Sequence, residues 1–270
     1  MTAGTLISPS VYGQLVDRYL FNFRVDPDAL QERLPPGGWL RPRLVNGSGV
    51  VSFCLLRLKG VTLWPLPTFA GIDSISCAYR CAVTDASGAR PEPSVYILGR
   101  STDVPVVSRL GTRLFAGEMP LVRASINESA AATATTGVSI DARYPDGRRL
   151  FAATVRPAAE GSRLQKSRLF GTPGEFVAFI KGGLSSYTPS TRPGRYSRVD
   201  LAEDSNSYRA ADAAIGYSWL ESAWKDAGVE FDSAFHATGG LYRLKYLGSK
   251  EWKADNDAAA GTAYTPENAA

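Results

Sequence analysis

The chain has 270 residues, of which 44% are hydrophobic and 21% charged, and its formal net charge is +4. This composition is typical of a globular protein, and a small net charge without a run of four basic residues gives no indication of a nucleic-acid surface. The first ten residues lack the basic and apolar regions of a secretory signal, and no stretch of 18 residues is continuously apolar. We therefore expect a soluble, cytoplasmic protein that binds neither nucleic acid nor membrane.

The first quarter of the chain predicts a strand, a short helix, a second strand and a loop. Tyr12 to Arg24 ("YGQLVDRYLFNFR") reads as the first strand. Asp26 caps the following helix, and Pro27 occupies its first position. The segment "GVVSFCLLRLKGV" is apolar and rich in β-branched residues, which favours a strand. The Pro-rich "LWPLPTFAG" then predicts a loop.

Short strands follow at close spacing through the middle of the chain. They are "DSISCAYRCAV", "SVYILGRS", "PLVRASINE", "TGVSIDARY" and "RLFAATVRP", and turn-forming stretches such as "DASGARPEP" and "PDGR" connect them. Two basic stretches that Pro and Gly interrupt, "RPAAEGSRLQKSR" and "TRPGRYSR", predict solvated loops.

Two helices and an interrupted strand complete the predicted elements. "TPGEFVAFIKGG" reads as a helix capped by Thr172, and "SWLESAWKDAG" reads as a helix that Gly228 ends. "AFHATGGLYRLKYLG" predicts a strand with a bulge or bend at its two adjacent glycines. The pattern indicates one mainly β (α+β) domain over residues 1–248, built on a curved antiparallel sheet, and a flexible tail over 249–270.

The cysteines and the single histidine do not predict a disulfide or a metal site. Cys77 and Cys81 lie in one predicted strand, about 13 Å apart, which is beyond disulfide reach. With Cys54 they make three cysteines, which we expect to be buried, reduced thiols. His236 alone provides too few ligands for a Cys/His zinc site, and beside Phe235 it is most readily structural.

Strict alternation in "SISCAYRCAV" separates two different faces. One face carries Ile75, Cys77, Tyr79, Cys81 and Val83, and the other carries Ser74, Ser76, Ala78, Arg80 and Ala82. An exposed strand usually presents Lys, Glu and Thr. A face of small residues with one arginine instead indicates an interior space that the arginine reaches across.

The neighbouring strand supplies a second arginine. Alternation predicts that Tyr96, Leu98 and Arg100 share one face, while Val95, Ile97 and Gly99 share the other. If the guanidinium groups of Arg80 and Arg100 face one interior, they form a cationic pair suited to a carboxylate or phosphate. The alternative is that each arginine reaches water or pairs with a carboxylate such as Asp103 or Glu118.

Other catalytic patterns have little support. Glu118 could act as a general acid or base in apolar surroundings, or it could balance Arg113 or Arg123. No G-x-S-x-G motif is present, so hydrolase chemistry has no positive support. "GGLYRLKYLG" lacks the strand–loop–helix context of a phosphate-binding loop.

The order of these segments resembles the acetoacetate decarboxylase-like superfamily, and most closely a bacterial branch of it that lacks the Schiff-base lysine. The resemblance depends most on the segment "FNFRVDPDALQERLPPGGWLRPRLVNGSGVVSFCLLRLKGV", which has a V-D-P-x-x-L-x-x-x-L-P-P-G turn between two predicted strands. "YRCAV", "SVYILGRS", "GTPGEFVAFI" and "FHATGGLYRLKYLG" match later segments in order, so the resemblance spans Val16 to Leu247. It implies a cone-like, strongly bent antiparallel β-barrel that encloses a cavity and often assembles into homo-oligomers.

The chain departs from the superfamily's decarboxylases at the nucleophile. In those enzymes a lysine after the mid-chain strand forms a Schiff base with a β-keto acid, and its amine must first lose a proton. The matching region, Gly99 to Gly117, offers only arginines, namely Arg100, Arg109 and Arg113. A guanidinium stays protonated at any relevant pH and cannot form the imine.

The remaining lysines do not supply the missing nucleophile. Those nearest in sequence lie in other predicted elements and are assigned no such role: Lys59, Lys166 and Lys181. The branch commonly has a glutamate four residues before the strand arginine, where this chain has Ser76. The resemblance therefore implies a cationic, lysine-free cavity in which enamine-type decarboxylation does not occur.

Three functions remain open on the sequence. The first is an enzyme of lyase or isomerase type acting on a carboxylate-bearing keto or aromatic substrate. Its candidate residues are Arg80, Arg100 and Ser76 for the carboxylate, Tyr96 or Glu118 for proton transfer, and Arg109 for polarising a carbonyl. The second is a non-catalytic binding protein for a small acidic metabolite, and the third is a packed scaffold without a ligand. None of the three calls for a cofactor or a metal.

Overall fold

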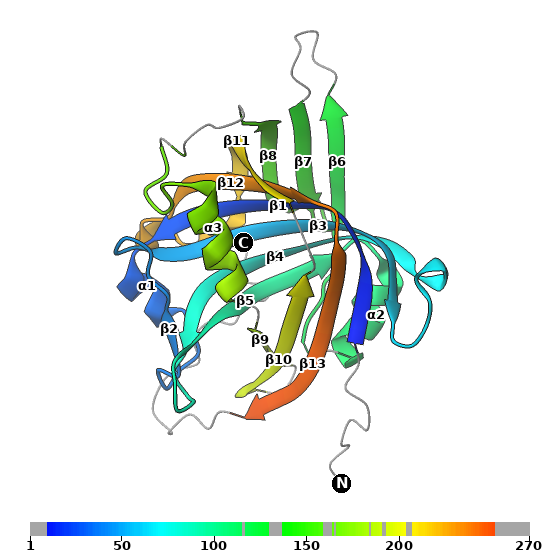
Figure 1. Ribbon diagram of the computed structural model, residues 1–270, viewed down its shortest axis with the longest axis horizontal. Coiled ribbons are helices and arrows are strands. Elements are labelled where there is room, and N and C mark those ends of the chain that lie inside the picture. The colour runs from blue at the N-terminus through cyan, green and yellow to red at the C-terminus, as the bar shows by residue number, and fades with distance from the viewer. Residues whose placement is uncertain are drawn as a thin grey trace.

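The computed structural model describes residues 10–114, 117–129, 137–158, 164, 166–183, 185–190, 193–203 and 207–251. Within them the chain forms a single 13-stranded sheet with a few short helices (Figure 1). The strands are β1 (Ser10–Val25), β2 (Leu40–Pro42), β3 (Gly49–Leu63), β4 (Ile72–Asp85), β5 (Glu92–Thr102), β6 (Arg123–Ser129), β7 (Gly137–Arg143), β8 (Arg149–Pro157), β9 (Ser185–Pro189), β10 (Arg195–Glu203), β11 (Ser207–Ser218), β12 (Glu230–Thr238) and β13 (Leu241–Glu251). The helices are α1 (Pro27–Glu32), α2 (Pro105–Leu114), α3 (Pro173–Gly182) and α4 (Trp219–Ala223), and the 3-10 turns are Thr68–Ala70 and Lys225–Ala227.

Seven of the strands close into a ring. The sheet runs β13-β10-β9-β5-β4-β3-β1, and an additional pairing between β13 and β1 joins its ends. The pairing is antiparallel throughout this ring except between β5 and β9, which run parallel. The predicted mainly β fold with a strongly bent sheet around an interior is therefore confirmed, and the expectation of purely antiparallel pairing is wrong at one strand pair.

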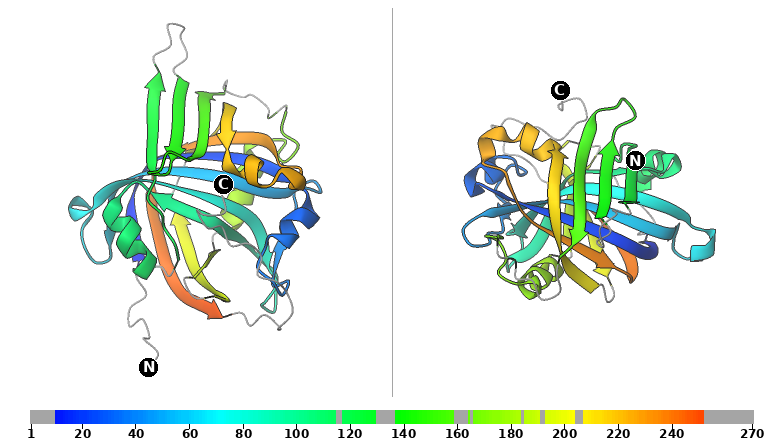
Figure 2. Two further views of the ribbon diagram at one scale, coloured as in Figure 1. Left: turned by 180° about the vertical axis from the view of Figure 1, so that it is seen from behind. Right: turned by 90° about the horizontal axis from the view of Figure 1, so that it is seen from above.

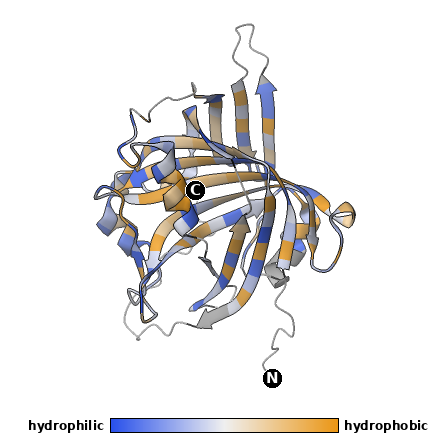
Figure 3. Cartoon of the chain, viewed as in Figure 1, coloured by the Kyte–Doolittle hydropathy of each residue, from blue (hydrophilic) through white to orange (hydrophobic). Residues whose placement is uncertain are grey.

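The other strands form a wing that continues from β1 in the order β12-β11-β8-β7-β6. Figures 1 and 2 show β6, β7 and β8 projecting to one side of the central strands, while β9, β10 and β13 curve away on the other side. Figure 3 shows hydrophobic residues along much of β1 and β3, which lie between these two parts.

The central strands are buried on both faces, so their two faces pack into different clusters. The outer face of β1, β3 and β4 packs against the wing, where Phe53 stacks on Phe151 with ring centroids 4.0 Å apart. On the inner face, a second cluster lies beneath α3, where Phe176 stacks on Phe235 at 3.6 Å. Burial of these large rings is the main source of stability for both clusters.

Local sequence signals fix the ends of the helices as expected. The Asp26 carboxylate accepts hydrogen bonds from the backbone N–H groups of Asp28 and Ala29, and Pro27 begins α1. The Thr172 hydroxyl accepts the Glu175 N–H at 3.2 Å and so caps α3. Gly239 and Gly240 both have positive φ and separate β12 from β13, which pair with successive parts of β1. The predicted bend at this glycine pair is confirmed.

Two loop predictions are wrong. "TRPGRYSR" was expected to be a solvated loop, but Arg195 begins β10 and the Ser197 side chain is fully buried between β9 and β13. The predicted tail begins too early, because residues 249–251 continue β13 by pairing with the start of β10. In both cases long-range pairing overrides a local composition that is typical of loops. The rest of the predicted tail lies outside the described residues.

None of the helices in the described ranges is both long enough and apolar enough to cross a membrane.

Candidate functional site

The ring encloses a cavity of about 380 Å³, here called the larger lobe. All seven ring strands contribute to its wall, including β9 through Ser186 and Thr188 and β13 through Tyr242 and Leu244. A smaller lobe of about 210 Å³ adjoins it beneath α3. The two lobes share a group of lining residues: Arg18, Arg80, Val95, Gly183 and Leu201. Their combined size is that of a small-molecule site.

The face of β4 that carries small residues is the cavity wall. Ser74, Ser76, Ala78 and Arg80 line the larger lobe, and Ala82 lines the smaller one. The alternate residues of the same strand, including Cys77, Tyr79 and Cys81, pack in the outer cluster, although Cys77 and Cys81 also border the larger and the smaller lobe respectively. The alternation in the sequence therefore assigns both faces of β4 correctly. Burial raises the pKa of the Cys77 and Cys81 thiols, and both are free.

A β-bulge in β5 decides which of its side chains reach the cavity. Tyr79 pairs with Gly99, but the next residue of β4, Arg80, pairs with Ile97, so Leu98 is an extra residue in β5. Ile97 and Arg100 consequently both face the cavity. The prediction that Tyr96 and Arg100 share a face is wrong, because an inserted residue reverses the alternation beyond it.

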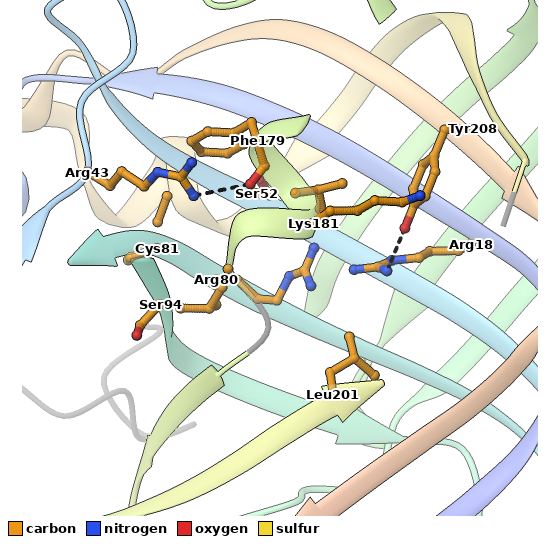
Figure 4. Close-up of a pocket in the computed structure, with 14 residues that line it drawn as sticks. Arg18, Arg43, Ser52, Arg80, Cys81, Ser94, Phe179, Lys181, Leu201 and Tyr208 are labelled. Atoms are coloured by element: carbon orange, nitrogen blue, oxygen red, sulfur yellow. Dashed lines mark hydrogen bonds between the residues drawn. The ribbon is translucent and has the colours of Figure 1, made fainter. Parts of the chain in front are cut away.

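Two guanidinium groups meet where the lobes join. Figure 4 shows Arg18 from β1 and Arg80 from β4 pointing toward one another. Arg18 is 1% exposed and donates a hydrogen bond of 2.9 Å to the Tyr208 hydroxyl from β11. Lys181, at the C-terminal end of α3, extends toward the same tyrosine (Figure 4). Three cationic side chains from three elements therefore surround one space.

Arg80 has the least compensated charge in this group. Its Nε atom is buried without a hydrogen-bond partner, and no hydrogen bond or ion pair joins its side chain to another residue in the described ranges. The described residues that line the two lobes include no aspartate and no glutamate. A half-buried guanidinium without a counter-charge is partly desolvated, and an anion in the cavity would compensate its charge.

Arg100 adds a third guanidinium to the larger lobe. Burial lowers the pKa of Arg100 to about 10, so the side chain remains cationic at neutral pH. Its terminal nitrogen lies 3.2 Å from the place where a Cβ atom on Gly117 would stand. Glycine at this position leaves room for the guanidinium close to the backbone.

Two serine hydroxyl groups line the wall between Arg80 and the first residue of β4, Ile72. The Ser74 Oγ lies 3.1 Å from the Ser76 Oγ and 3.1 Å from the Thr102 Oγ1, both within hydrogen-bond distance. Ser76, which the sequence suggested as a ligand-binding residue, therefore lies in the same cavity as Arg80 and Arg100.

The three residues suggested for catalysis are not brought together. Tyr96 packs in the outer cluster with its ring centroid 6.3 Å from that of Tyr196, and burial raises its pKa well above the usual value for a phenol. Arg109 and Glu118 are both exposed to solvent. Arg113 also belongs to α2, but its side chain lies outside the described residues.

The expectation of a lysine-free cavity is wrong. Lys181 lines the smaller lobe, although it is exposed and comes from α3 rather than from the segment after β5. Phe176 packs in a cluster with Leu20 and Cys54 of the ring and with Phe235 of β12, and this places the last turn of α3 over the cavity. A cation in the last turn of a helix is also favoured by the helix dipole.

Comparison with known proteins supports the fold. The solved structures that resemble the chain include an acetoacetate decarboxylase from Legionella pneumophila subsp. pneumophila str. Philadelphia 1, with a TM-score of 0.59 and 12% identity over 95% of this chain and 93% of that one. An acetoacetate decarboxylase-like enzyme from Sphingomonas wittichii RW1 has a TM-score of 0.57 and 14% identity, over 94% and 97% of the two chains. The enduracididine biosynthesis enzyme MppR, complexed with pyruvate, has a TM-score of 0.53 and 14% identity over 92% of each chain.

These likenesses define the class of fold. The chain has the acetoacetate decarboxylase-like fold over nearly its whole length, so the resemblance drawn from the sequence is confirmed at that level. No protein-family model matches the chain, and no curated protein does.

Arg18, Lys181 and Tyr208 are lining residues that sequence reasoning missed. Arg18 had a visible signal, since it is the only arginine inside the apolar segment "LVDRYLFNF" of the first strand. Lys181 and Tyr208 had none, because their proximity to Arg18 depends on how α3 and β11 pack in three dimensions.

Proposed function

We propose that this protein binds a small carboxylate-bearing molecule in the cavity of the ring. The single observation that carries the proposal is the half-buried Arg80 side chain, which has a buried Nε atom, faces Arg18 and has no protein counter-charge among the described residues. Two facing guanidinium groups can each donate two parallel hydrogen bonds to a carboxylate. The anion would therefore lie between Arg18 and Arg80.

The surrounding residues would reinforce this binding. Arg100 and Lys181 add positive charge from two other sides of the cavity, and Ser76 offers a hydroxyl on the same wall. The low-dielectric wall strengthens each of these interactions relative to water. The structural neighbour MppR is complexed with pyruvate, a small carboxylate, which is consistent with a ligand of this class here.

Binding without catalysis is favoured over the lyase or isomerase reading. The groups suggested for proton transfer, Tyr96 and Glu118, lie in the outer cluster and at the exposed surface. The described cavity residues include no carboxylate and no imidazole that could act as a general base. A cavity of arginines without such a partner suits retention of an acid better than its conversion.

One observation favours a second candidate, an enzyme in which Tyr208 moves the proton. Its hydroxyl is held by Arg18 at 2.9 Å beside the smaller lobe, and Lys181 reaches toward it. Neighbouring cations can stabilise negative charge that develops on an oxygen. In this reading Arg80 would still hold the carboxylate of the substrate.

The test is thermal unfolding with a panel of organic acids. Pyruvate, benzoate, phenylpyruvate and octanoate are added separately, each beside its neutral amide. An acid present at one hundred times its Kd should raise the Tm by roughly 5–10 °C, while its amide should not. Proton NMR of the same mixtures after long incubation separates the two candidates, since an unchanged acid supports binding and a new product supports the enzyme.

Two variants complete the experiment. Arg80→Ala should abolish the shift that the acid produces, yet leave the Tm of the free protein unchanged or slightly higher, because it removes an uncompensated charge. The matched control is Arg90→Ala, which removes an exposed arginine in the turn after β4 and should retain the full shift. The proposal is contradicted if no acid raises the Tm of the wild-type protein, or if the amides act equally well.

A further inference from the structure

The larger lobe is elongated, and its two ends differ in chemistry. Pairing between β3 and β4 places Ser52 opposite Arg80, then Cys54 opposite Ala78, Leu56 opposite Ser76, Leu58 opposite Ser74 and Val61 opposite Ile72. Ile72 lies eight positions before Arg80 in β4, which corresponds to about 26 Å along the strand. Arg80 lies at one end of this path, Arg100 pairs with Ala78, and Arg18 starts opposite Leu56 and points toward Arg80 (Figure 4).

The other end of the path is apolar. Beyond Leu58 the wall is mainly hydrophobic, although Thr62 also lines it, and its hydrophobic side chains come from the loop between β3 and β4, from α2, from the segment before β6 and from the strand ends. They are Val61, Leu63, Leu66, Ile72, Val106 and Met119. Among them, Leu66 is 54% exposed, Ile72 42% and Val106 44%, so the wall leads to solvent. Figure 1 shows this loop and α2 at the end of the central strands away from α3.

Close backbone contacts and hydrogen bonds fix the conformation of the loop between β3 and β4, which forms part of the apolar opening. Gly60 and Gly71 pack so closely that a Cβ atom on Gly71 would lie 2.3 Å from the Gly60 carbonyl oxygen. The Asp73 carboxylate accepts the Gly60 N–H at 3.0 Å, and the Tyr12 hydroxyl donates to the Leu66 carbonyl. A preformed apolar opening loses little entropy when a ligand covers it.

We infer that the ligand is an amphipathic acid, with its carboxylate at Arg18 and Arg80 and an extended aliphatic or arylalkyl group along the apolar wall. This inference rests on the proposed function and names the substrate class of the same site. A three-carbon acid held at Arg80 would leave the hydrophobic residues from Leu58 to Ile72 in contact with water. A longer apolar group would cover them, and such burial is the main source of affinity in apolar sites.

The test compares affinities along a homologous series. Isothermal titration calorimetry is performed with butanoate, hexanoate, octanoate, decanoate and dodecanoate, and with the corresponding primary alcohols. Each added methylene that reaches the apolar wall should tighten binding up to about fourfold. The acids should bind more tightly than the alcohols at every length, because only the acids meet the guanidinium pair.

A variant at the opening locates the apolar group. The double substitution Leu66→Ser with Ile72→Ser alters exposed side chains, so the fold should be retained. It should weaken the binding of decanoate and dodecanoate severalfold and leave butanoate unchanged. The matched control is Leu44→Ser, which changes a leucine that is 52% exposed in the connection between β2 and β3 and should bind the whole series normally.

The outcomes distinguish this inference from the proposed function. Acids that bind with an affinity independent of chain length would overturn the amphipathic ligand and leave anion binding intact. Alcohols that bind as tightly as acids would overturn anion binding and leave the apolar wall as the site. If no member of either series binds while pyruvate or benzoate raises the Tm, the amphipathic ligand is overturned and anion binding stands; both proposals fail only if no acid of either set binds.

Discussion

Asp17 and Arg18 are neighbours in β1, and their side chains lie on opposite faces of the strand. Arg18 points into the ring, whereas Asp17 lies on the outer side, where it forms an ion pair with Arg57 and contacts His236 Nε2 at 2.8 Å. The His236 ring stacks on Tyr19 with centroids 4.4 Å apart. His236 therefore belongs to a polar cluster outside the cavity. Burial raises the pKa of Tyr19 to about 12 and keeps its phenol neutral.

This cluster should make stability depend on pH through Asp17. Burial opposes ionisation of its carboxyl, but hydrogen bonds from His236 and Arg57 outweigh burial and lower the pKa of Asp17 below its ordinary value. The unfolded chain therefore takes up this proton first as the pH falls. The stabilisation is fully present above the unfolded value near pH ~4 and is lost as the pH falls through the folded value.

The substitution Asp17→Asn tests this dependence by urea unfolding at several pH values. At pH 7 the variant should be less stable than the wild type by about 1–3 kcal/mol, because Arg57 loses a largely buried counter-charge. The difference should narrow progressively below pH ~4, where the wild-type carboxyl is also protonated. Asp146→Asn is the control, since the pair between Asp146 and Arg148 is open to solvent and should contribute little. A difference that stays constant down to pH 3 would contradict this account.

At the scale of single residues, the sequence identified the cavity face of β4 but not the charge opposite it. Arg80 stood out because small residues flank it on the same face. Arg18 lies in β1, which is buried on both faces and carries large apolar residues on each. The alternation of polar and apolar residues therefore cannot show which face of β1 lines the cavity. The lysine at the cavity was missed because sequence distance says nothing about where α3 crosses the ring.

Among the elements, the loop between β3 and β4 depends on two glycines. Gly60 has a φ of +60°, and a Cβ atom there would lie 2.6 Å from the Thr68 carbonyl oxygen. The loop above it carries Trp64 and Phe69, which are 72% and 91% exposed. The close approach of Gly60 to Gly71 and Thr68 is therefore what holds this apolar segment at the opening of the larger lobe.

Substitution of Gly60 by alanine should reveal this crowding. Gly60→Ala should lower the free energy of unfolding by about 2–4 kcal/mol, since it adds steric overlap with backbone to the strain of a left-handed conformation. Gly47→Ala is the matched control: its φ is +79°, but nothing lies within 4 Å of an added Cβ atom. It should cost only about 1 kcal/mol. If urea unfolding shows that both variants lose the same free energy of unfolding, the backbone around Gly60 can move to accommodate the added Cβ atom, which contradicts this account.

The faces of β5 could be predicted from the sequence only in part. The residues of β5 were placed in a strand correctly, but the extra residue at Leu98 reverses its alternation halfway along. Bulges of this kind have no reliable signature in a short apolar sequence. β10 was missed because its first residues follow Pro and Gly, and it is stabilised by pairing with β9 and β13 rather than by its own composition.

The whole molecule consists of a ring around the cavity and a wing that borders the smaller lobe through Tyr208 of β11. Every ring strand contributes a lining residue, whereas no residue of β6 or β7 does so among those described. The outer cluster connects these two parts through rings such as Phe53 and Phe151. A ligand in the cavity should therefore stabilise the two parts to different extents.

Hydrogen exchange followed by mass spectrometry measures this difference. When an acid from the panel saturates the protein, exchange should slow in β9, β10 and β13, whose local opening would expose the cavity. Exchange in β6 and β7 should change much less. Arg80→Ala with the same acid serves as the control and should show no protection. Protection confined to β6 and β7 would place the ligand outside the ring and contradict the proposed site.

The overall class of fold was accessible from the sequence because the order of strands, turns and capped helices resembles a known superfamily. The closure of the ring could not be predicted from the sequence, since it pairs residues 10–14 with residues 241–245. No local pattern in either segment specifies a partner more than two hundred residues away.

The junction of β1 with β13 also has a consequence during synthesis. β1 leaves the ribosome before the other strands of the ring, and β13 emerges only after all of them. Until then the nascent chain holds a partly wound sheet whose unpaired edges can join other chains. A metabolite that needs the closed ring can therefore bind only molecules in which β13 has been synthesised, and its presence would favour these molecules over shorter fragments.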